Sequence, residues 1–380
     1  MSDTIARLRD ALQESQFDWL AMASQPHVTY ATGYRSVAGD LFRTHRMLVL
    51  VSVERTLLIG GASDGAAVLE SAIVDDYVPF GTFYFESEGS AAPESQLSGR
   101  NASFEAAVTE AVAMAGLAGR VGMDSDASEL AELFQGSGVE TVDAGGWLAQ
   151  LRAVKLPSEV DRLRDAVRLA EAGIDAAIEM ACIGATEIEL ANVVASTMAA
   201  GGGVPGFMVV TSGPRSALSD ARPTHRQLEL GDLVRFDVGC TVDGYWSDIG
   251  RTAVVGDADQ LQADRYAAIF EGEDAQLRAV RSGITAGDLF DLAVARVEQA
   301  GLSPYRRHHC GHAIGLEIYE RPIVSSGTET VLEPGMVFCV ETPFYEVGWG
   351  GMMVEDALVV TDDGCDVLST SDRTLRVISA

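Results

Sequence analysis

Short apolar runs alternate with amphipathic patterns through residues 1 to about 150. A helical period predicts helices at 2–16, near 101–116 and near 127–135. Strands are expected where β-branched and other apolar residues cluster between turn residues; these runs are DWLAMAS, RMLVLVSV, TLLIG, DDYVPF, RVGMD and VETVD. RMLVLVSV and TLLIG are close enough to form a hairpin, and residues 81–101 are loop-like because Gly, Ser and Pro gather there. This pattern indicates an α/β domain.

The remainder of the chain opens with longer helical patterns. Pro157, with Ser158 as the expected N-cap, begins an amphipathic helix that runs through about Ala181, and a second helix covers roughly 187–200. The change of pattern near 151–157 predicts a domain boundary. We therefore expect two domains, at residues 1–152 and 153–380.

Residues 228–252, LELGDLVRFDVGCTVDGYWSDIGRT, predict a β-hairpin, because two β-rich runs flank Asp243-Gly244. Each run carries one carboxylate, Asp237 and Asp248. If the runs pair, these aspartates lie opposite or diagonal, about 5 to 8 Å apart at Cβ. Two unpartnered carboxylates that close would raise one pKa, and a bound cation would remove the repulsion. Taken alone, such a stretch is more often a surface hairpin that carries two solvated aspartates.

The arrangement occurs twice along the chain. The motif at 228–231 recurs 104 residues later at 332–335, and each copy places an acid six residues after its glycine, Asp237 and then Glu341. The second copy also has an acid beyond a glycine-rich turn, Glu355. An upstream motif recurs as well, as Gly184-Ala185-Thr186 and Gly283-Ile284-Thr285. The segment from about 155 to 380 is therefore predicted to be a degenerate duplication of helices followed by a carboxylate hairpin.

Composition and charge exclude several classes of protein. The chain has 27 basic and 56 acidic residues, a net charge of −29, and this surface disfavours nucleic acid and anionic membranes as partners. No apolar run approaches the 18 residues of a membrane span, and the charged start of the chain lacks a signal core. The five cysteines form no CxxC pair or disulfide framework. We expect a cytoplasmic protein that binds neither nucleic acid nor membrane.

A histidine cluster completes the candidate chemistry. Residues 306–317, RRHHCGHAIGLE, contain three of the six histidines of the chain. One neutral imidazole among carboxylates is a usual donor set for a transition metal such as Mn, Co, Zn or Fe. The alternative is a chance cluster on a surface loop.

These motifs together resemble the pita-bread metallopeptidases, which include Xaa-Pro aminopeptidases, prolidases and methionine aminopeptidases. The residues that carry the resemblance are Asp237 and Asp248, 11 apart, His312 in GHAIGLE, and Glu341 and Glu355, 14 apart. LRAVKLPSEVDRLRDA is similar to the family's entry into its catalytic domain. The resemblance implies an α/β N-terminal domain of the creatinase/prolidase type, followed by an α+β pita-bread catalytic domain with internal duplication.

The resemblance also implies a site with two divalent metal ions. Asp248 and Glu355 would bridge the metals, Asp237 would hold one, and His312 with Glu341 the other. A hydroxide between the two ions would attack the scissile carbonyl. Further roles implied by the family are proton transfer by Glu341, substrate contact by His308, and support of the ligands by the hydroxyl of Thr252. We also expect a homodimer.

Three departures from the family's motifs concern substrate handling. Asp220 and Tyr319 stand where the family usually has histidines, and Met353 stands where it often has an arginine. Asp220 and Tyr319 are therefore candidate substrate-binding residues. The expected function is a Xaa-Pro aminopeptidase- or dipeptidase-like hydrolase of a small peptide or related amide. Two alternatives are a relative that acts on a non-peptide small molecule, as an amide or amidine hydrolase or a lyase, and a non-catalytic binding protein.

Three cysteines lie beside the candidate ligands. Cys339 precedes Glu341 by two residues and should share its face of a strand, and Cys310 precedes His312 by two. Cys240 follows Asp237 by three. These thiols are expected to fill space beneath the site; the alternative is that nearby cations bias them towards thiolate.

Overall fold

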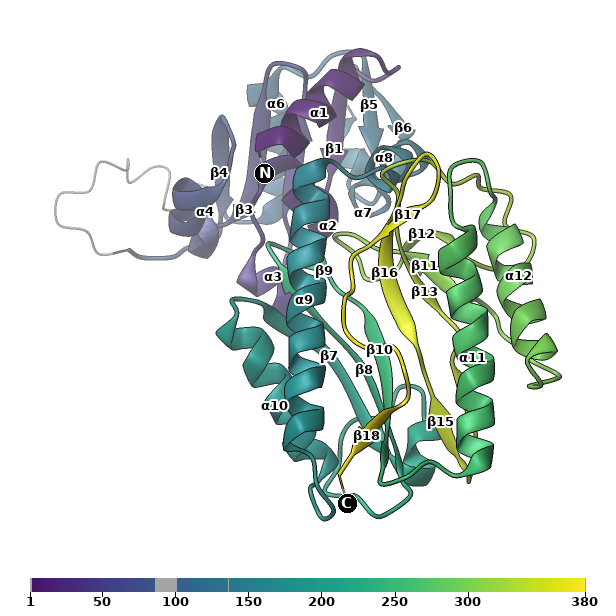
Figure 1. Cartoon of the computed structure of the whole chain (residues 1–380). Helices are drawn as coiled ribbons and strands as arrows, with labels where there is room; N and C mark the ends of the chain where they lie inside the picture. Colours follow the sequence, from purple (N-terminus) through teal and green to yellow (C-terminus); the bar gives the residue numbers. More distant parts are fainter. Residues whose placement is uncertain (1, 86–100, 136, 380) are drawn as a thin grey trace. The chain divides into compact units, whose positions relative to one another are not determined.

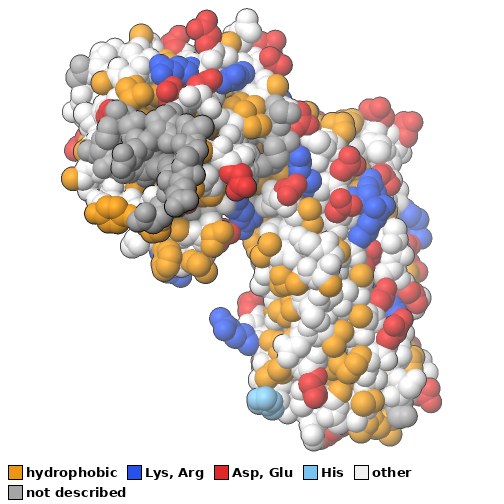
Figure 2. Space-filling view, turned by 90° about the vertical axis from the view of Figure 1, so that its left-hand side faces the viewer, with side chains coloured by type: hydrophobic (Ala, Val, Ile, Leu, Met, Phe, Trp, Pro, Cys, Tyr) orange, Lys and Arg blue, Asp and Glu red, His pale blue; other side chains and the backbone are white. Residues whose placement is uncertain are grey.

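The computed structural model describes residues 2–85, 101–135 and 137–379, and the chain forms two compact units, Met1–Arg152 and Ala153–Ala380. Residues 86–100 of the predicted loop at 81–101 lie outside the described part. Among the described helices, none combines the length and the apolarity needed to cross a lipid bilayer. Asp and Glu side chains are scattered over the visible surface in Figure 2, as the net charge of −29 implies.

The first unit contains a mixed sheet with the strand order β4-β3-β2-β1-β5-β6. Its strands are β1 (Trp19–Met22), β2 (Leu48–Val51), β3 (Thr56–Gly61), β4 (Asp76–Phe80), β5 (Arg120–Met123) and β6 (Glu140–Asp143). The predicted hairpin is confirmed, since β2 and β3 pair antiparallel with Leu48 opposite Ile59. β3 with β4, β1 with β5 and β5 with β6 are parallel pairs. The α/β character of this unit is confirmed (Figure 1).

The helices of the first unit correct one prediction. The expected helix at 127–135 is wrong as a single element, because α7 (Ser125–Ser128) ends and a separate 3₁₀ turn, η2 (Ala131–Phe134), follows. Leu130 and Phe134 are buried in the core of this unit, and the chain breaks at Leu130 to place both there. The other helices are α1 (Ser2–Gln13), α2 (Gln25–Thr32), α3 (Val37–Leu41), α4 (Gly65–Ser71), α6 (Phe104–Ala115) and α8 (Gly145–Ala153), with a 3₁₀ turn, η1, at Ala62–Asp64.

The second unit contains a larger sheet with the order β12-β11-β13-β16-β10-β8-β7. The strands on this path are β7 (Val204–Ser212), β8 (Leu233–Val242), β10 (Ile249–Val255), β11 (Gly311–Ala313), β12 (Glu320–Ile323), β13 (Val337–Glu341) and β16 (Glu355–Val360). Shorter strands are β9 (Tyr245–Trp246), β14 (Phe344–Glu346), β15 (Gly350–Met352), β17 (Cys365–Val367) and β18 (Arg376–Ile378). In Figure 1, α9 (Pro157–Met180) and α10 (Glu187–Ala200) flank the strands of the first half, and α11 (Gln260–Ala279) and α12 (Ala286–Gln299) flank those of the second.

The start of α9 differs from the prediction. The N-cap is Leu156, not Ser158, because Pro157 occupies the first helical position, where its missing N–H costs nothing. The Glu159 side chain accepts a hydrogen bond from Leu156 N at 2.9 Å, so a carboxylate satisfies the end of the helix.

The internal duplication is confirmed by matching hydrogen bonds in the two halves. Gly184 N donates to Leu228 O at 2.9 Å, and Gly283 N donates to Leu332 O at 3.0 Å. Thr186 and Thr285 each close a capping box, on α10 and α12. Gly231 and Gly335 both adopt a positive φ, 85° and 88°, and their N–H groups donate to Val255 O and Val360 O, respectively. The motifs that recur in the sequence are therefore the turns that set the same geometry twice.

The predicted hairpin around Asp243-Gly244 is present, with φ values of 49° and 86° at the two turn residues. The run that follows is split, since β9 ends at Trp246 and β10 begins at Ile249. Asp248 lies in this break. Because Gly250 pairs with Asp237, Asp248 lies diagonal to Asp237, two positions from the direct partner.

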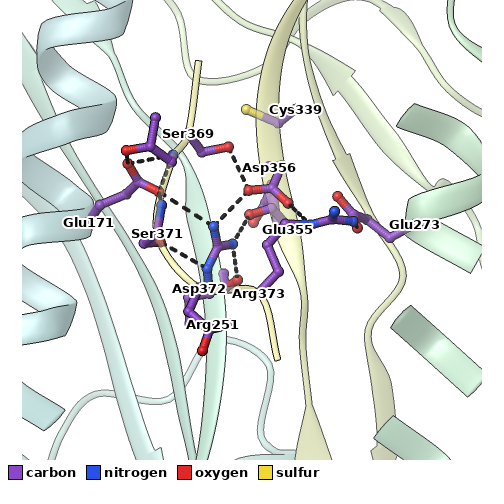
Figure 3. A network of polar contacts seen from close by, with 12 residues as sticks. Glu171, Arg251, Glu273, Cys339, Glu355, Asp356, Ser369, Ser371, Asp372 and Arg373 are labelled. Atoms are coloured by element: carbon purple, nitrogen blue, oxygen red, sulfur yellow. Dashed lines mark hydrogen bonds and ion pairs between the residues drawn. The ribbon is translucent and has the colours of Figure 1, made fainter. Parts of the chain in front are cut away.

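A buried ionic network ties β10 to β16 on one face of the sheet (Figure 3). Arg251 Nη2 lies 2.7 Å from Asp356 Oδ1 and 3.5 Å from Glu171 Oε1. Arg373, also bonded to Glu273, approaches Asp356 from the other side, with Nε 2.8 Å from Oδ2. Burial alone would raise the pKa of Asp356, but Arg251, Arg373 and the hydrogen bonds to the carboxylate together outweigh burial, and the pKa is lowered. The network therefore links β10 and β16 through buried side chains whose charges are paired.

In the first unit, Asp124 is expected to supply a pH-dependent part of the stability. Its carboxylate accepts bonds from Ala23 N, Ser24 N and Ala127 N, and His27 Nδ1 lies 2.8 Å away. Burial would raise the pKa of Asp124, but these partners lower it to about 2. A carboxyl with a lowered folded-state pKa stabilises above its unfolded value, near 4, and loses this effect as pH falls towards 2. Asp124→Asn should cost about 2 kcal/mol at pH 7.

Scanning calorimetry from pH 7 down to pH 3 would measure this effect. The difference between wild type and Asp124→Asn should shrink as the solution becomes more acidic. Asp126→Asn, which changes an exposed acid on the same helix, should stay within about 0.5 kcal/mol of wild type. A difference for Asp124→Asn that does not depend on pH would contradict the assignment.

Candidate metal centre

Three of the predicted ligands lie in one row across the sheet of the second unit. Asp237 on β8 pairs with Gly250 on β10, Gly250 pairs with Glu355 on β16, and Glu355 pairs with Glu341 on β13. Directly paired residues point to the same face of a sheet. A Cβ at Gly250 would lie 3.0 Å from Glu355 Cβ and 2.6 Å from Met353 Cγ, so glycine leaves the middle of the row open.

Asp248 and His312 lie in the adjacent row. His312 pairs with Cys339, and Cys339 pairs with Ala357. Because Cys339 and Ala357 are small, the longer side chains on either side can meet above them. His312 Nε2 lies 3.4 Å from Asp248 Oδ2, and one ligand atom each of Asp248, His312 and Glu355 falls within 4.8 Å of the others. The structure thus brings all five predicted metal ligands to one face of one sheet.

The donor atoms fit a divalent cation. Asp248 Oδ1, His312 Nε2 and Glu355 Oε2 are buried and find no hydrogen-bond partner among residues 2–85, 101–135 and 137–379. Buried polar atoms without a partner are costly, and carboxylates and an imidazole that converge are metal donors. His312 Nδ1 lies 3.1 Å from Ala313 O, which directs Nε2 towards the carboxylates.

The electrostatics of the site lead to the same conclusion. Burial, followed by the charge of Asp248, raises the pKa of Asp237 to about 7. Burial and the neighbouring carboxylates Asp248 and Glu341 also raise the pKa of Glu355 well above its usual value. Glu341 differs, because its partners His309 and Arg307 outweigh burial and lower its pKa. The carboxylates repel one another in the absence of a cation, as expected from the sequence.

Three basic residues at the site were missed by the sequence analysis. Arg235 Nη1 lies 2.8 Å from Asp237 Oδ2, His309 Nδ1 lies 2.9 Å from Glu341 Oε1, and Arg307 Nη2 lies 3.6 Å from Glu341 Oε2. The strand period could have revealed Arg235, since it stands two residues before Asp237 on the same strand. His309 could not be separated from His308 by sequence, because both precede β11.

The predicted substrate residues lie around two cavities. A cavity of about 210 Å³ is lined by Asp237, Glu341, Glu355, His308, Asp220 and Tyr319, among others. A larger one of about 930 Å³ also reaches Asp220 and Tyr319 and has apolar walls from Phe207, Met208 and Ile188. The Tyr319 ring stacks on the His312 ring, with centroids 3.8 Å apart and planes 21° apart. Asp220 and His308 are exposed to solvent.

Thr252 and Met353 interact with each other. The Thr252 hydroxyl donates to Met353 O at 2.9 Å and accepts from Met353 N at 2.8 Å. The hydroxyl predicted to support the ligands therefore fixes the backbone two residues before Glu355. Met353 itself is buried and lines the smaller cavity.

The cysteines beside the ligands are buried. Cys339 Sγ donates to Asp248 O at 3.5 Å, and Cys240 and Cys310 are fully buried. Burial, with the nearby carboxylates, raises the pKa of Cys339 well above its usual value, so the thiol form is favoured. Both observations agree with the expectation that these thiols fill space.

Comparison with known proteins places the chain in a family. The model of Metallopeptidase family M24 matches residues 161–362, and that of the Creatinase/Prolidase N-terminal domain matches residues 4–154. The Xaa-Pro dipeptidase of Pyrococcus furiosus is 35% identical over 230 residues, which are 60% of this chain and 66% of that protein. The Xaa-Pro dipeptidase of Pyrococcus horikoshii is 28% identical over 380 residues, 99% of each chain.

A solved structure supports the fold. The X-Pro aminopeptidase from Thermotoga maritima aligns over 98% of this chain and 99% of its own, with a TM-score of 0.83 and 21% identity. The resemblance to pita-bread enzymes and the fold class expected from the sequence are thereby confirmed, and the family implies divalent metal ions. The chain belongs to metallopeptidase family M24 and is a hydrolase of that family.

Proposed function

We propose that the protein is a dinuclear-metal-dependent hydrolase that cleaves a small peptide of the Xaa-Pro type or a related small amide. The observation that supports this most directly is the convergence of Asp248, His312 and Glu355, whose buried atoms Oδ1, Nε2 and Oε2 lack hydrogen-bond partners within the described chain. Asp237 and Glu341 lie on the same face of the sheet. Relatives that match 99% and 60% of the chain are named Xaa-Pro dipeptidases. Asp237, Asp248, His312, Glu341 and Glu355 would hold the ions, and the family resemblance implies that Asp248 and Glu355 would be shared between them.

The chemistry divides between the ions and the side chains. Two divalent ions, when bound, acidify the attacking water and polarise the scissile carbonyl. We assign proton transfer to Glu341. Its carboxylate, which His309 and Arg307 hold in place and ionised, can accept the proton of the attacking water and pass it to the leaving nitrogen. His308 lines the cavity beside Glu341 and is positioned to contact the substrate.

Tyr319 supplies a hydrogen-bond donor that does not titrate near neutral pH. Burial, followed by the charge of Glu341, raises the pKa of the Tyr319 phenol. Its ring is held against His312, and the residue lines both cavities. A histidine at this position would change its charge near pH 6.5. We infer that Tyr319 contacts the substrate as a neutral donor.

Asp220 gives the pocket a carboxylate that a substrate with an additional cationic group could use. Asp220 is an exposed acid on the wall of both cavities, and the larger cavity of about 930 Å³ is otherwise mainly apolar near Phe207 and Met208. A carboxylate at this place would pair with a cationic group of the substrate. A small amide with such a group is therefore included in the proposal.

The homodimer expected from the sequence stays a prediction, which light scattering in solution would test.

Loss of a bridging ligand should remove both metals. Asp248→Ala and Glu355→Ala should each abolish binding of both ions, whereas Asp237→Ala should retain more of one, because Asp237 is assigned to a single ion. Elemental analysis of protein loaded with Mn or Co measures the stoichiometry. Asp243→Asn changes an acid of the same hairpin away from the site and should bind as wild type. Two ions per chain in Asp248→Ala would remove the bridging assignment.

The Tyr319 hydroxyl should act on turnover. Tyr319→Phe keeps the stacked ring and removes the donor, so kcat should fall on the order of 100-fold with unchanged metal content. Steady-state kinetics with elemental analysis on the same sample provide the measurement. An unchanged kcat would show that the hydroxyl does not contact the reacting group.

The contribution of Asp220 should depend on the substrate. With a panel of Xaa-Pro dipeptides and small amides, Asp220→Ala should raise KM roughly fivefold for cationic substrates, since an exposed ion pair contributes up to about 1 kcal/mol. Neutral substrates should be unaffected. Fast turnover of ordinary Xaa-Pro dipeptides, with no selective effect of Asp220→Ala, would sink the idea of a cationic group.

A further inference from the structure

Arg235 is a fully buried arginine beside one of the proposed metal ligands. Its Nη1 donates to Asp237 Oδ2 at 2.8 Å. Its other bonds go to main-chain carbonyls: Nε to Ser216 O at 3.0 Å, and Nη2 to Leu218 O and Ser219 O, both at 2.8 Å. A buried guanidinium is retained only when its donors are satisfied. Here one carboxylate and three carbonyls do this.

The three carbonyls belong to the segment that presents Asp220. The turn η3 (Gly213–Ala217) is followed by its C-cap Leu218, and Ser219 and Asp220 come next as wall residues of the smaller cavity. Leu218 and Ser219 are exposed, so they contribute little apolar packing of their own to hold the segment. Arg235 is therefore a fixed link between β8 and the segment Ser216–Asp220.

The neighbours of Arg235 restrict its movement. The guanidinium carbon lies 5.2 Å from the centroid of the Tyr345 ring, and Arg307 lies 5.8 Å from the same ring. Met353, where the family often has an arginine, lines the same cavity as Asp237 but carries no charge. Among the described residues, Arg235 is the basic side chain that contacts Asp237.

We propose that Arg235 is a positioning residue that couples metal binding at Asp237 to the placement of the Asp220 segment. An ion held by Asp237 fixes that carboxylate, the fixed carboxylate orients the guanidinium, and the guanidinium holds the carbonyls of Ser216, Leu218 and Ser219. Coupling of this kind is reciprocal, so substrate contacts with the segment favour the metal-loaded form. The inference rests on the proposed function only in that a metal ion occupies Asp237.

Hydrogen exchange with and without metal tests the coupling without any substrate. In wild type, loading the protein with Mn should slow amide exchange across residues 216–222 by about tenfold, in the range typical of coupling between sites. Arg235→Met should reduce this protection to less than about twofold. Arg235→Lys keeps a positive charge near Asp237 but lacks the planar guanidinium that bonds Asp237 and the three carbonyls at once, so it should lose the protection as well. Elemental analysis of the same samples shows whether each variant is loaded.

Arg226→Met is the matched control. Arg226 also pairs with an aspartate, Asp232, at 2.9 Å, and binds Ser212 just before η3, but Asp232 is not a proposed ligand. This variant should lower the melting temperature and keep the metal-dependent protection. Kinetics provide a second readout, in which Arg235→Lys should raise KM about tenfold for a cleaved substrate while kcat changes less.

Two results would overturn the coupling. Metal-dependent protection in Arg235→Lys equal to wild type would show that the fork is not needed, and an equal loss in Arg226→Met would show general loosening of the segment. Both leave the proposed function standing, because metal is still bound. A wild-type chain that binds no Mn or Co would instead remove the proposed function together with this inference.

Discussion

Repulsion among buried carboxylates on one face of one sheet is the constraint on which the second unit depends. Asp237, Glu355 and Glu341 share a row, and Asp248 lies beside it, so each acid raises the cost of ionising the next. The fold places them there through backbone pairing, which is indifferent to their charge. A ligand that binds only the folded state adds its binding free energy to stability. The clustered acids therefore favour the binding of a cation, and its binding free energy would offset the cost of burying them.

The opposite face of the same strands shows how the fold supports this arrangement. Arg251 follows Gly250 and Asp356 follows Glu355, so one step along each strand moves from the row of candidate donors to the paired ions on the other face. Figure 3 shows Arg251 between Glu171 and Asp356, with Arg373 and Glu273 beyond. A site whose polar atoms lack hydrogen-bond partners keeps its geometry only when the surrounding side chains and strands are rigidly packed. The paired network supplies it through β10 and β16.

The sequence predicted this half well because its signals are local and repeated. Each copy combines a positive-φ glycine, an acid six residues later and a second acid across a turn, so Asp237 and Glu341 could be found without knowing the fold. Arg307 and His309 could not be predicted from the sequence, because their contact with Glu341 depends on how β11 pairs with β13. The break between α7 and η2 has a similar origin, since packing of the core overrides a helical pattern there.

The residues that depart from the family's motifs gather on the walls of one small cavity. Asp220, Tyr319 and Met353 all line the space of about 210 Å³ that also exposes Asp237 and Glu341. Met353 places no charge there, and the buried Arg235 contacts Asp237 from within β8. Tyr319 removes a titratable ring and keeps a hydrogen-bond donor. These changes share one space, whereas the five predicted donors keep the spacing on which the resemblance rests, so the changes concern the substrate side of the site and not its donors.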